Sequence, residues 1–398
     1  MNNKNLLSPV LLLLFLAGSP AFAQLANRTV DVDGVTRGYL AYLPAGYDGS
    51  TAMPLMISFH GGSSTALDQL ALSDMRALAD QDGVILAYPQ GLPEFPGGPT
   101  IWNSVGPFSN GVDEVGFVAA LIDDLAAEFA IDESRVWASG YSNGANMAWE
   151  LACFLSDRIA AIGPVAGSMW TWTENLCAPL SPVGVVSIHG TLDFYNPYDG
   201  GPPFSLGLIA ASEYWVAQAG ADATPTIVDV PNIAPGDGST VENYTWANGE
   251  NCVSIEHYRV QNGGHDWPGA FGNQDIDSTQ VIWNYVTQYD LDGRIDCPDT
   301  QDSDEDGIAD GEDNCTLVEN SDQRDTDLDG YGNACDPDLT QDCAVNFLDL
   351  AEMKSVFFTA DPDADLTGDG SVNFLDLGLM KQLFFEAPGP SGVGGVCD

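Results

Sequence analysis

Three residues whose side chains together can transfer an acyl group occur in order along the sequence. Ser142 is the centre of a Gly-Tyr-Ser-Asn-Gly stretch, Asp193 ends a His-Gly-Thr-Leu-Asp stretch, and His265 lies within Gly-Gly-His-Asp-Trp-Pro-Gly. A serine hydroxyl is a weak nucleophile near neutral pH, but an imidazole can remove its proton while a carboxylate orients that imidazole. The sequence therefore predicts nucleophilic catalysis by Ser142, with His265 as general base and Asp193 as the acid.

The surroundings of Ser142 strengthen a motif that is weak by itself in a chain with 43 glycines. Residues 135–139 are typical of a buried strand and residues 145–151 of a helix, which is the strand-turn-helix setting of a nucleophile elbow. The order serine, acid, histidine is the one expected for such an elbow. Asp199 and Asp266 remain alternatives to Asp193 as the acid.

A tetrahedral intermediate also needs donors for its oxyanion. The backbone N–H of Asn143 is one expected donor, and Gly62, in the His-Gly-Gly stretch that follows an apolar strand, is the other. His60 itself is expected to anchor this loop rather than to take part in catalysis. Trp102 and Trp267 are candidates for the walls of the substrate pocket, although each could equally belong to the core. This chemistry requires no cofactor.

Residues 24–292 alternate between strand-like and helix-like stretches. Alternation of this kind predicts an α/β fold with a mostly parallel sheet covered by helices on both faces. Asp113 and Glu114 suit the N-terminus of one of these helices better than a catalytic role. The expected strands are 29–43 (as a hairpin turning at 33–34), 54–59, 83–88, 135–139, 160–165, 183–188 and 254–260, and the expected helices are 113–130, one starting just after Ser142, and 278–289.

Residues 1–23 have the features of a signal peptide. One lysine precedes an apolar run too short to span a bilayer, and Ala-Phe-Ala precedes Gln24. We therefore expect a secreted, extracellular or cell-surface protein without membrane insertion. Eight cysteines in an oxidising compartment suggest four disulfides, and because no Cys-x-x-Cys pair occurs, zinc is not expected.

The net charge of -47 is unevenly distributed. Residues 292–398 hold 27 of the 58 acidic residues but 4 of the 11 basic ones. Such a surface repels nucleic acid and anionic lipid, so neither is an expected partner.

Six ordered blocks within residues 28–290 resemble the polyhydroxybutyrate depolymerase and feruloyl esterase-like family within carbohydrate esterase family one. They are His-Gly-Gly, Asp-Glu-Val-Gly-Phe, Gly-Tyr-Ser-Asn-Gly, Ala-Ala-Ile-Gly-Pro-Val-Ala-Gly, His-Gly-Thr-Leu-Asp and Gly-Gly-His-Asp-Trp-Pro-Gly. The resemblance implies an α/β-hydrolase fold, hydrolysis of carboxylic esters and the triad assigned above. It also implies a disulfide between Cys153 and Cys177. The family includes polyester depolymerases, feruloyl esterases and acetylxylan esterases, so it leaves the substrate open.

Beyond residue 292 the sequence contains four loops with oxygen side chains at positions 1, 3, 5, 9 and 12, which is a spacing suited to Ca²⁺. The first two loops resemble thrombospondin type 3 repeats, a resemblance that implies a bond between Cys315 and Cys335. The predicted ligands of these two loops are Asp302, Asp304, Asp306, Asp310 and Asp313, then Asp325, Asp327, Asp329, Asn333 and Asp336.

The last two loops repeat Val-Asn-Phe-Leu-Asp-Leu and resemble a dockerin, a calcium-loaded module that binds cohesin domains. One departure is Cys343, which stands where the loop expects glycine. We hypothesise a disulfide between Cys343 and Cys397, and by elimination one between Cys252 and Cys297. The predicted ligands are Asp338, Thr340, Asp342, Asn346 and Asp349, then Asp365, Thr367, Asp369, Asn373 and Asp376.

Together these patterns predict a signal peptide (1–23), an α/β-hydrolase esterase domain (24–292), a linker with calcium repeats (293–337) and a small helical dockerin-like module (338–398). The favoured function is hydrolysis of feruloyl or acetyl esters of plant polysaccharides, with a cohesin-like or cell-surface partner for the last module. Polyhydroxyalkanoate depolymerisation is the alternative. A second alternative is a calcium-dependent adhesion or scaffold protein with an inactive hydrolase domain.

Overall fold

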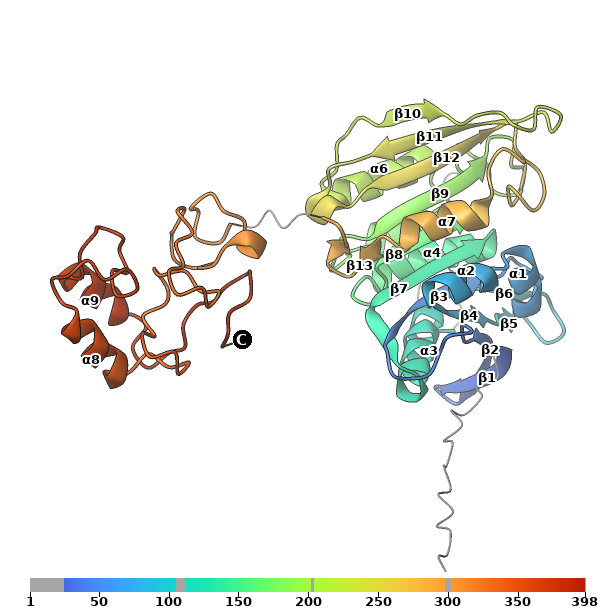
Figure 1. The fold of residues 1–398 in the computed structure, drawn as a ribbon. Helices are drawn as coiled ribbons and strands as arrows, with labels where there is room; N and C mark the ends of the chain where they lie inside the picture. The colour runs from blue at the N-terminus through green and yellow to red at the C-terminus, as the bar shows by residue number, and fades with distance from the viewer. Residues whose placement is uncertain (1–24, 105–111, 202–203, 298–301, 398) are drawn as a thin grey trace, which may run out of the picture. The chain divides into compact units, whose positions relative to one another are not determined.

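The structure, a computed structural model, describes residues 25–104, 112–201, 204–297 and 302–397 (Figure 1). The proposed signal peptide lies outside the described residues. The chain divides into two compact units, 1–296 and 297–398, close to the predicted change in composition. No described helix has the length and apolar character needed to cross a membrane.

The first unit is built on one mixed sheet, with the strand order β1-β2-β4-β3-β7-β8-β9-β12-β11-β10. The strands from β4 to β12 in this order run parallel, and β1–β2 and β11–β10 extend the sheet with antiparallel pairs. The strands are β1 (Leu25–Val32), β2 (Val35–Tyr42), β3 (Met53–Phe59), β4 (Ile85–Pro89), β7 (Ile131–Tyr141), β8 (Ala161–Val165), β9 (Gly184–Gly190), β10 (Thr226–Asp229), β11 (Thr240–Trp246) and β12 (Ile255–Gln261).

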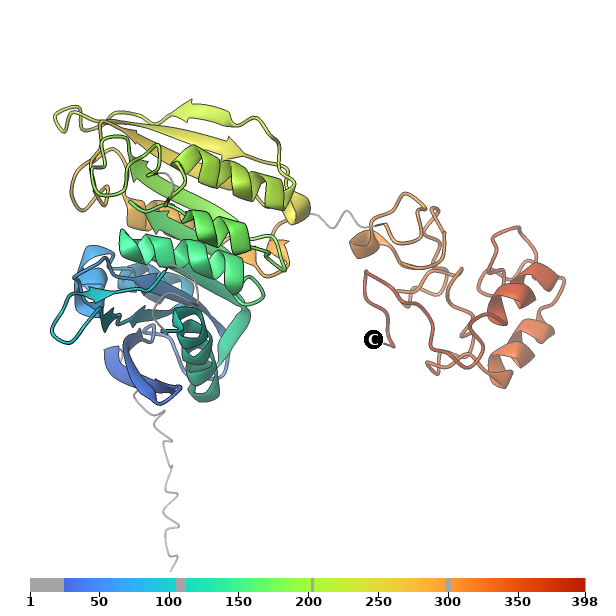
Figure 2. The same cartoon turned by 180° about the vertical axis from the view of Figure 1, so that it is seen from behind.

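Helices cover both faces of this sheet, as the alternation in the sequence predicts. Helices α1 (Ala66–Leu72), α2 (Arg76–Asp82) and α7 (Ser278–Val286) lie on the face turned to the viewer in Figure 1. Helices α3 (Glu114–Glu128), α4 (Asn143–Phe154), α5 (Thr171–Leu176) and α6 (Leu208–Ala219) lie on the other face, seen in Figure 2. The smaller elements are β5 (Leu92–Pro93), β6 (Thr100–Ile101), η1 (Glu250–Cys252), β13 (Tyr289–Asp290) and β14 (Gly293–Arg294).

Strands β4, β8 and β9 are buried from end to end, and burial on both faces favours the apolar residues that dominate their sequences. Every residue of β4, β8 and β9 is buried, whereas β1 alternates between exposed and half-buried residues. The predicted hairpin is confirmed, because Val32 pairs with Val35 and both Asp33 and Gly34 have positive φ. Asp113 caps α3 by accepting a hydrogen bond from Gly116, as its position predicted.

The second unit contains little regular structure, namely η2 (Asp310–Glu312), α8 (Phe347–Ser355) and α9 (Phe374–Met380). Helices α8 and α9 share a small apolar core that includes Met353 and Met380. The end of the chain returns to the acidic loops, where the amides of Gly389, Gly392 and Val396 donate to the carbonyls of Cys335, Asp313 and Asp329.

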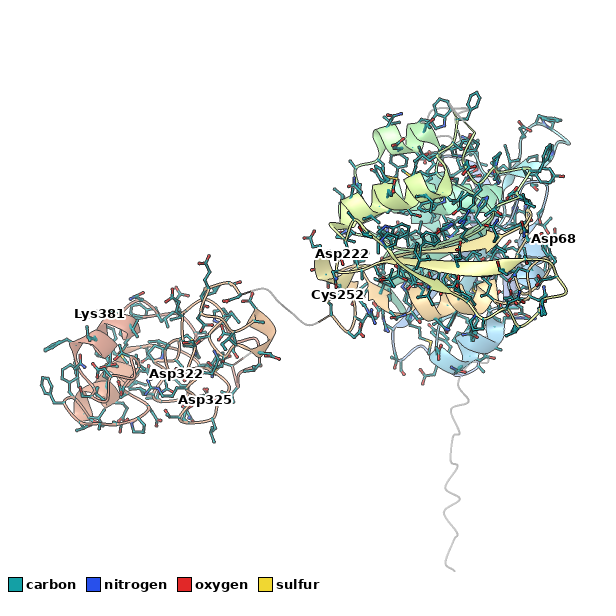
Figure 3. The ribbon with its side chains drawn as sticks, turned by 90° about the horizontal axis from the view of Figure 1, so that it is seen from above. Asp68, Asp222, Cys252, Asp322, Asp325 and Lys381 are labelled. Atoms are coloured by element: carbon teal, nitrogen blue, oxygen red, sulfur yellow. A yellow bond between two sulfur atoms is a disulfide. The ribbon has the colours of Figure 1, made fainter. Side chains whose placement is uncertain are left out.

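The structure contains the disulfides Cys153–Cys177, Cys315–Cys335 and Cys343–Cys397. Cys252, labelled in Figure 3, and Cys297 are disulfide-bonded as well. Because the other six cysteines pair among themselves, these two are left as partners, in agreement with the pairing expected by elimination.

Candidate active site

The chemically relevant residues follow four parallel strands at the same edge of the sheet. His60 and Gly62 follow β3, Ser142 follows β7, Asp193 follows β9, and His265 follows β12. The carboxyl ends of parallel strands meet at one edge, and ligands of open α/β sheets bind there. Residues more than 200 positions apart in the sequence are brought together in this way.

Ser142 occupies a strained turn between β7 and α4, with φ 56° and ψ −116°. Two glycines make this turn sterically possible. A Cβ at Gly140 would lie 2.3 Å from the carbonyl oxygen of Gly144, and a Cβ at Gly144 would lie 2.3 Å from that of Phe59. The Ser142 amide donates to the carbonyl of Val165 on the neighbouring strand, at 2.9 Å. The sequence thus forms a nucleophile elbow that holds the hydroxyl above the strand end.

Ser142, His265 and Asp193 form a continuous hydrogen-bonded chain. Ser142 Oγ lies 2.9 Å from His265 Nε2, and His265 Nδ1 lies 2.7 Å from Asp193 Oδ2. The carboxylate fixes the proton on Nδ1, which leaves Nε2 as an acceptor for the serine hydroxyl. The Asp193 side chain is fully buried, whereas that of His265 is 16 % exposed and so within reach of a substrate.

The structure distinguishes between the three candidate acids. Asp266 Oδ2 accepts a hydrogen bond from the Gly264 amide, and Asp199 is exposed on the loop before α6. Among the described residues, only Asp193 places a carboxylate oxygen against His265 Nδ1.

Asp193 has a second imidazole partner, which the sequence did not indicate. His189 Nε2 lies 3.3 Å from Asp193 Oδ2 and donates to the Asn196 carbonyl at 2.7 Å. The other carboxylate oxygen accepts from the amides of Tyr195 and Asn196. Burial alone would raise the pKa of the Asp193 carboxyl, but the hydrogen bonds from His189, His265 and Asn196 hold it well below its ordinary value of 3.8. Asp193 therefore stays ionised.

The loop that follows β3 is held in place by His60, as predicted. Its Nδ1–H donates to the Gly61 carbonyl at 2.7 Å, and its Nε2 accepts from the Gly91 amide at 2.9 Å. The side chain is completely buried, and burial lowers the pKa of His60, so the ring is neutral.

This loop brings Gly62 next to Asn143. The backbone amides of these two residues are the expected oxyanion donors. A Cβ at Gly62 would lie 3.8 Å from the Cβ of Asn143. The Asn143 side chain is fixed by the Trp102 backbone, since its Oδ1 accepts from the Trp102 amide at 2.6 Å and its Nδ2 donates to the Trp102 carbonyl at 3.0 Å. Asn143 is also the first residue of α4, whose N-terminal amides have no partner within the helix.

A cleft of about 560 Å³ opens at the triad, and Ser142, His265, Gly62 and Tyr195 are among the residues that line it. The expectation that Trp102 and Trp267 line this cleft is wrong. Both rings are buried in the core, because their indole N–H groups find acceptors there, the His60 carbonyl for Trp102 and the Thr279 hydroxyl for Trp267.

Tyr141 lines the cleft and was not predicted from the sequence. Its hydroxyl donates to the His265 carbonyl.

The four acidic loops of the second unit each contain the same kind of turn. In each loop the amide of the sixth residue donates to the carboxylate of the first: Gly307 to Asp302, Gly330 to Asp325, Cys343 to Asp338, and Gly370 to Asp365. All four sixth residues have positive φ, so Cys343, at φ 63°, adopts a conformation that favours glycine.

Carboxylates converge inside these loops. Three sets have ligand oxygens within 4.8 Å of one another: Asp302, Asp304 and Asp306; Asp325, Asp327 and Asp329; and Asp338, Asp342 and Asp349. In the fourth loop Thr367 Oγ1 donates to Asp376, as Thr340 does to Asp349 in the third. The donors are hard oxygens, which fit Ca²⁺.

Comparisons with known proteins show that this chain is similar to esterases. Residues 37–183 match the family model described as Esterase PHB depolymerase. The chain is 28% identical to feruloyl esterase B of Piromyces equi over 269 residues, 64% of this chain and 46% of that protein. It is 27% identical over 242 residues to the bifunctional acetylxylan esterase/xylanase XynS20E of Neocallimastix patriciarum, 61% of this chain and 32% of that protein. The chain thus spans less than half the length of either relative.

Among solved structures, acetyl xylan esterase from Aspergillus awamori matches with a TM-score of 0.46 and 16% sequence identity, covering 60% of this chain and 94% of that one.

The sheet, the elbow and the triad define the first unit as a serine hydrolase of the α/β-hydrolase type that acts on carboxylic esters. Residues 37–183 of this unit are similar to the PHB depolymerase esterase family.

Proposed function

We propose that this protein is a secreted esterase that hydrolyses feruloyl or acetyl esters of plant polysaccharides through an acyl-enzyme. The observation that carries the proposal is the alignment of Ser142, His265 and Asp193 at 2.9 and 2.7 Å beside a cleft. The relatives named as feruloyl and acetylxylan esterases support this class of substrate. Four disulfide-bonded cysteine pairs suit an oxidising, extracellular environment.

In the acylation step, Ser142 Oγ attacks the ester carbonyl while its proton passes to His265 Nε2. The carbonyl oxygen becomes an oxyanion that the amides of Gly62 and Asn143 stabilise, each worth about 3–4 kcal/mol in comparable reactions. When the intermediate collapses, the bond to the alcohol breaks and His265 returns the proton to the leaving oxygen. The acyl group is then esterified to Ser142.

In the deacylation step, His265 takes a proton from water, and the resulting hydroxide attacks the acyl-enzyme carbonyl. Collapse of the second intermediate releases the carboxylic acid and returns the proton to Ser142 Oγ. Asp193 stabilises the imidazolium in both steps and remains ionised because its pKa is held low.

Hydrolysis of p-nitrophenyl acetate by the full chain and by Ser142→Ala tests this mechanism. We expect turnover by the wild type and a loss of at least about 10⁴-fold in the variant, since the nucleophile is absent. A wild type without turnover, or an alanine variant that keeps it, would contradict the proposal. Methyl ferulate and acetylated xylan, tried in parallel, distinguish the two acyl groups.

Polyester depolymerisation is a second candidate, because the matching family model is described by that activity. The triad would cleave the ester bonds of polyhydroxybutyrate by the same steps. Clearing of a polyhydroxybutyrate suspension, with no release of ferulate or acetate from the polysaccharide substrates, would favour this candidate over the first.

We further propose that the second unit binds Ca²⁺ and anchors the esterase to a cohesin-like or cell-surface partner. The three converging carboxylate sets support the calcium part of this proposal. A bound ion would offset the repulsion between these carboxylates and so stabilise loops that have little regular structure.

Calorimetric titration of the full chain with Ca²⁺ tests the calcium proposal. We expect saturable binding that weakens in Asp325→Asn, because Asp325 is the first residue of its loop. Asp322→Asn, three residues away and outside the predicted ligand set, is the matched control (Figure 3 labels both). Absence of binding by the wild type would reject calcium as a ligand.

A further inference from the structure

The segment formed by β6 and Trp102 contacts both of the loops that carry the expected oxyanion donors. Trp102 follows β6 directly and is 1 % exposed. The two donors are the backbone amides of Gly62 and Asn143, and the position of a backbone amide is set by the conformation of its loop rather than by a side-chain rotamer. The separation of the two amides therefore depends on what holds the two loops together.

Two hydrogen bonds from this segment hold the loop after β3, one on each side of Gly62. The Trp102 indole N–H donates to the carbonyl of His60, which precedes Gly62, at 2.8 Å. The amide of Ser63, which follows Gly62, donates to the Thr100 carbonyl at 2.7 Å. Gly62 therefore lies between two points that are fixed to the same short stretch of chain.

The same segment holds the other donor through its side chain. The Asn143 carboxamide accepts from the Trp102 amide at 2.6 Å and donates to the Trp102 carbonyl at 3.0 Å. This pairing needs a planar group with an acceptor and a donor side by side, which a carboxamide supplies. Trp102 thus contacts the loop of one donor through its ring and the side chain of the other donor through its backbone.

The core fixes the Trp102 ring in one orientation. The ring stacks on Phe117 with centres 6.5 Å apart, and it meets Phe59 edge to face at 5.1 Å. The Arg37 guanidinium lies over the Phe117 ring, 3.9 Å from its centre, and forms a buried ion pair with Glu114. Aromatic pairs and a desolvated cation over a ring are both stabilising. The direction of the indole N–H is therefore set before any substrate binds.

We infer that Trp102 is a positioning residue of the oxyanion hole, which sets the separation of the Gly62 and Asn143 amides although its own side chain is buried away from the cleft. This inference rests on the proposed esterase mechanism. Donors that are already in place stabilise a developing oxyanion because they need no reorganisation during the reaction. A misplacement of about 1 Å can lower the rate by about 10²-fold.

Trp102→Phe tests the contact made by the indole. It keeps an aromatic ring in the core but leaves the His60 carbonyl without its donor. Trp137→Phe is the matched control, because Trp137 is also 1 % exposed, donates its indole N–H to the Tyr289 carbonyl at 2.9 Å, and is not among the residues that line the cleft. Each variant loses one buried hydrogen bond of the same kind, so we expect similar losses of stability.

Asn143→Ala tests the contact made by the Trp102 backbone. It removes the carboxamide but retains the backbone amide that serves as the oxyanion donor. Because the Asn143 side chain is only half-buried, its removal leaves no large cavity. This variant keeps the inference testable if Trp102→Phe does not fold, which melting temperatures of all variants will show.

Inhibition by a trifluoromethyl ketone reports on the oxyanion hole. Ser142 Oγ adds to the ketone carbon, the serine proton passes to His265, and the former carbonyl oxygen becomes an oxyanion. In Trp102→Phe and in Asn143→Ala we expect kcat/KM for p-nitrophenyl acetate to fall by about 30-fold, which is less than the roughly 10²–10³-fold cost of removing a donor outright. The inhibition constant Ki of the ketone should rise by the same factor.

The control and the triad should behave differently. In Trp137→Phe we expect kcat/KM and Ki to stay within about threefold of the wild-type values. The pH dependence of kcat/KM, which reports the titration of the general base, should not move in any variant, because none of them alters a contact of His265.

The inference is overturned if kcat/KM in Trp102→Phe, or in Asn143→Ala where the first variant does not fold, stays within about threefold of the wild type. A lower kcat/KM with an unchanged Ki would also overturn it, since the loss would lie outside the oxyanion hole. So would equal losses in Trp102→Phe and Trp137→Phe, which would mean that only core packing was damaged. A wild type that hydrolyses no ester contradicts the esterase function itself, whereas an active wild type with an unaffected Trp102→Phe contradicts only the positioning role.

Discussion

Replacing Asp193 with asparagine changes one charge and leaves the shape of the side chain intact. The Oδ1 position must still accept from the amides of Tyr195 and Asn196, at 2.8 and 2.9 Å. The new NH₂ group therefore takes the Oδ2 position, 2.7 Å from His265 Nδ1. Two donors cannot share this contact, so His265 must carry its proton on Nε2, the atom that should accept the proton of Ser142.

With that tautomer the general base is lost and the imidazolium loses its counter-charge. The comparable change in serine proteases lowers kcat by about 10⁴-fold, equivalent to about 5.5 kcal/mol of activation free energy. His189 adds to the penalty, because its Nε2 lies 3.3 Å from the same oxygen position. We expect a loss of kcat of this size on p-nitrophenyl acetate, with KM nearly unchanged.

Asp266→Asn and Asp199→Asn are the matched controls, because each removes one nearby carboxylate that does not contact His265. We expect both to keep kcat within about fivefold of the wild type. Melting temperatures of all three variants separate lost catalysis from lost folding. If Asp193→Asn keeps more than a tenth of the wild-type kcat, or if Asp266→Asn is the inactive variant, the assignment of the acid is wrong.

Three further predictions concern other parts of the molecule. His257 is buried between Ser187 and Tyr198, and burial lowers its pKa from 6.5 to about 3. The folded protein therefore binds fewer protons than the unfolded chain between these values, so stability falls as pH drops from 6.5 toward 3, by about 1.4 kcal/mol per pH unit. His257→Gln should flatten the melting temperature over pH 4–7, and an unchanged slope would exclude His257 as its source. Gly140→Ala should lower kcat by about 10²-fold, because its Cβ would displace the Gly144 carbonyl and hence Ser142. Normal labelling by a fluorophosphonate would show that the elbow tolerates it. If calcium stabilises the second unit, EDTA should make residues 302–397 sensitive to protease while esterase activity persists; equal resistance with and without EDTA would count against that role.

Much of the fold could be predicted because several of its central strands are short apolar runs with clear ends. The predicted ranges 54–59, 160–165 and 183–188 agree closely with β3, β8 and β9. The edge strands β10 and β11 were missed. All four residues of β10 are exposed and β11 is mostly half-buried, so neither has the apolar pattern that indicates a strand. Helix α1, with seven residues, is too short for a clear helical period.

By itself the sequence determined the types of chemical group and their order, since strand, turn and helix around Ser142 depend on local residue preferences. It could not determine which carboxylate faces His265, because Asp193, Asp199 and Asp266 all lie in plausible loops. In the structure β9 pairs with β12, and this pairing brings the Asp193 carboxylate against the His265 imidazole. Tertiary structure also placed Trp102 and Trp267 inside the core and Tyr195 on the cleft. Burial of an aromatic ring depends on what surrounds it in space, and a linear sequence does not contain that information.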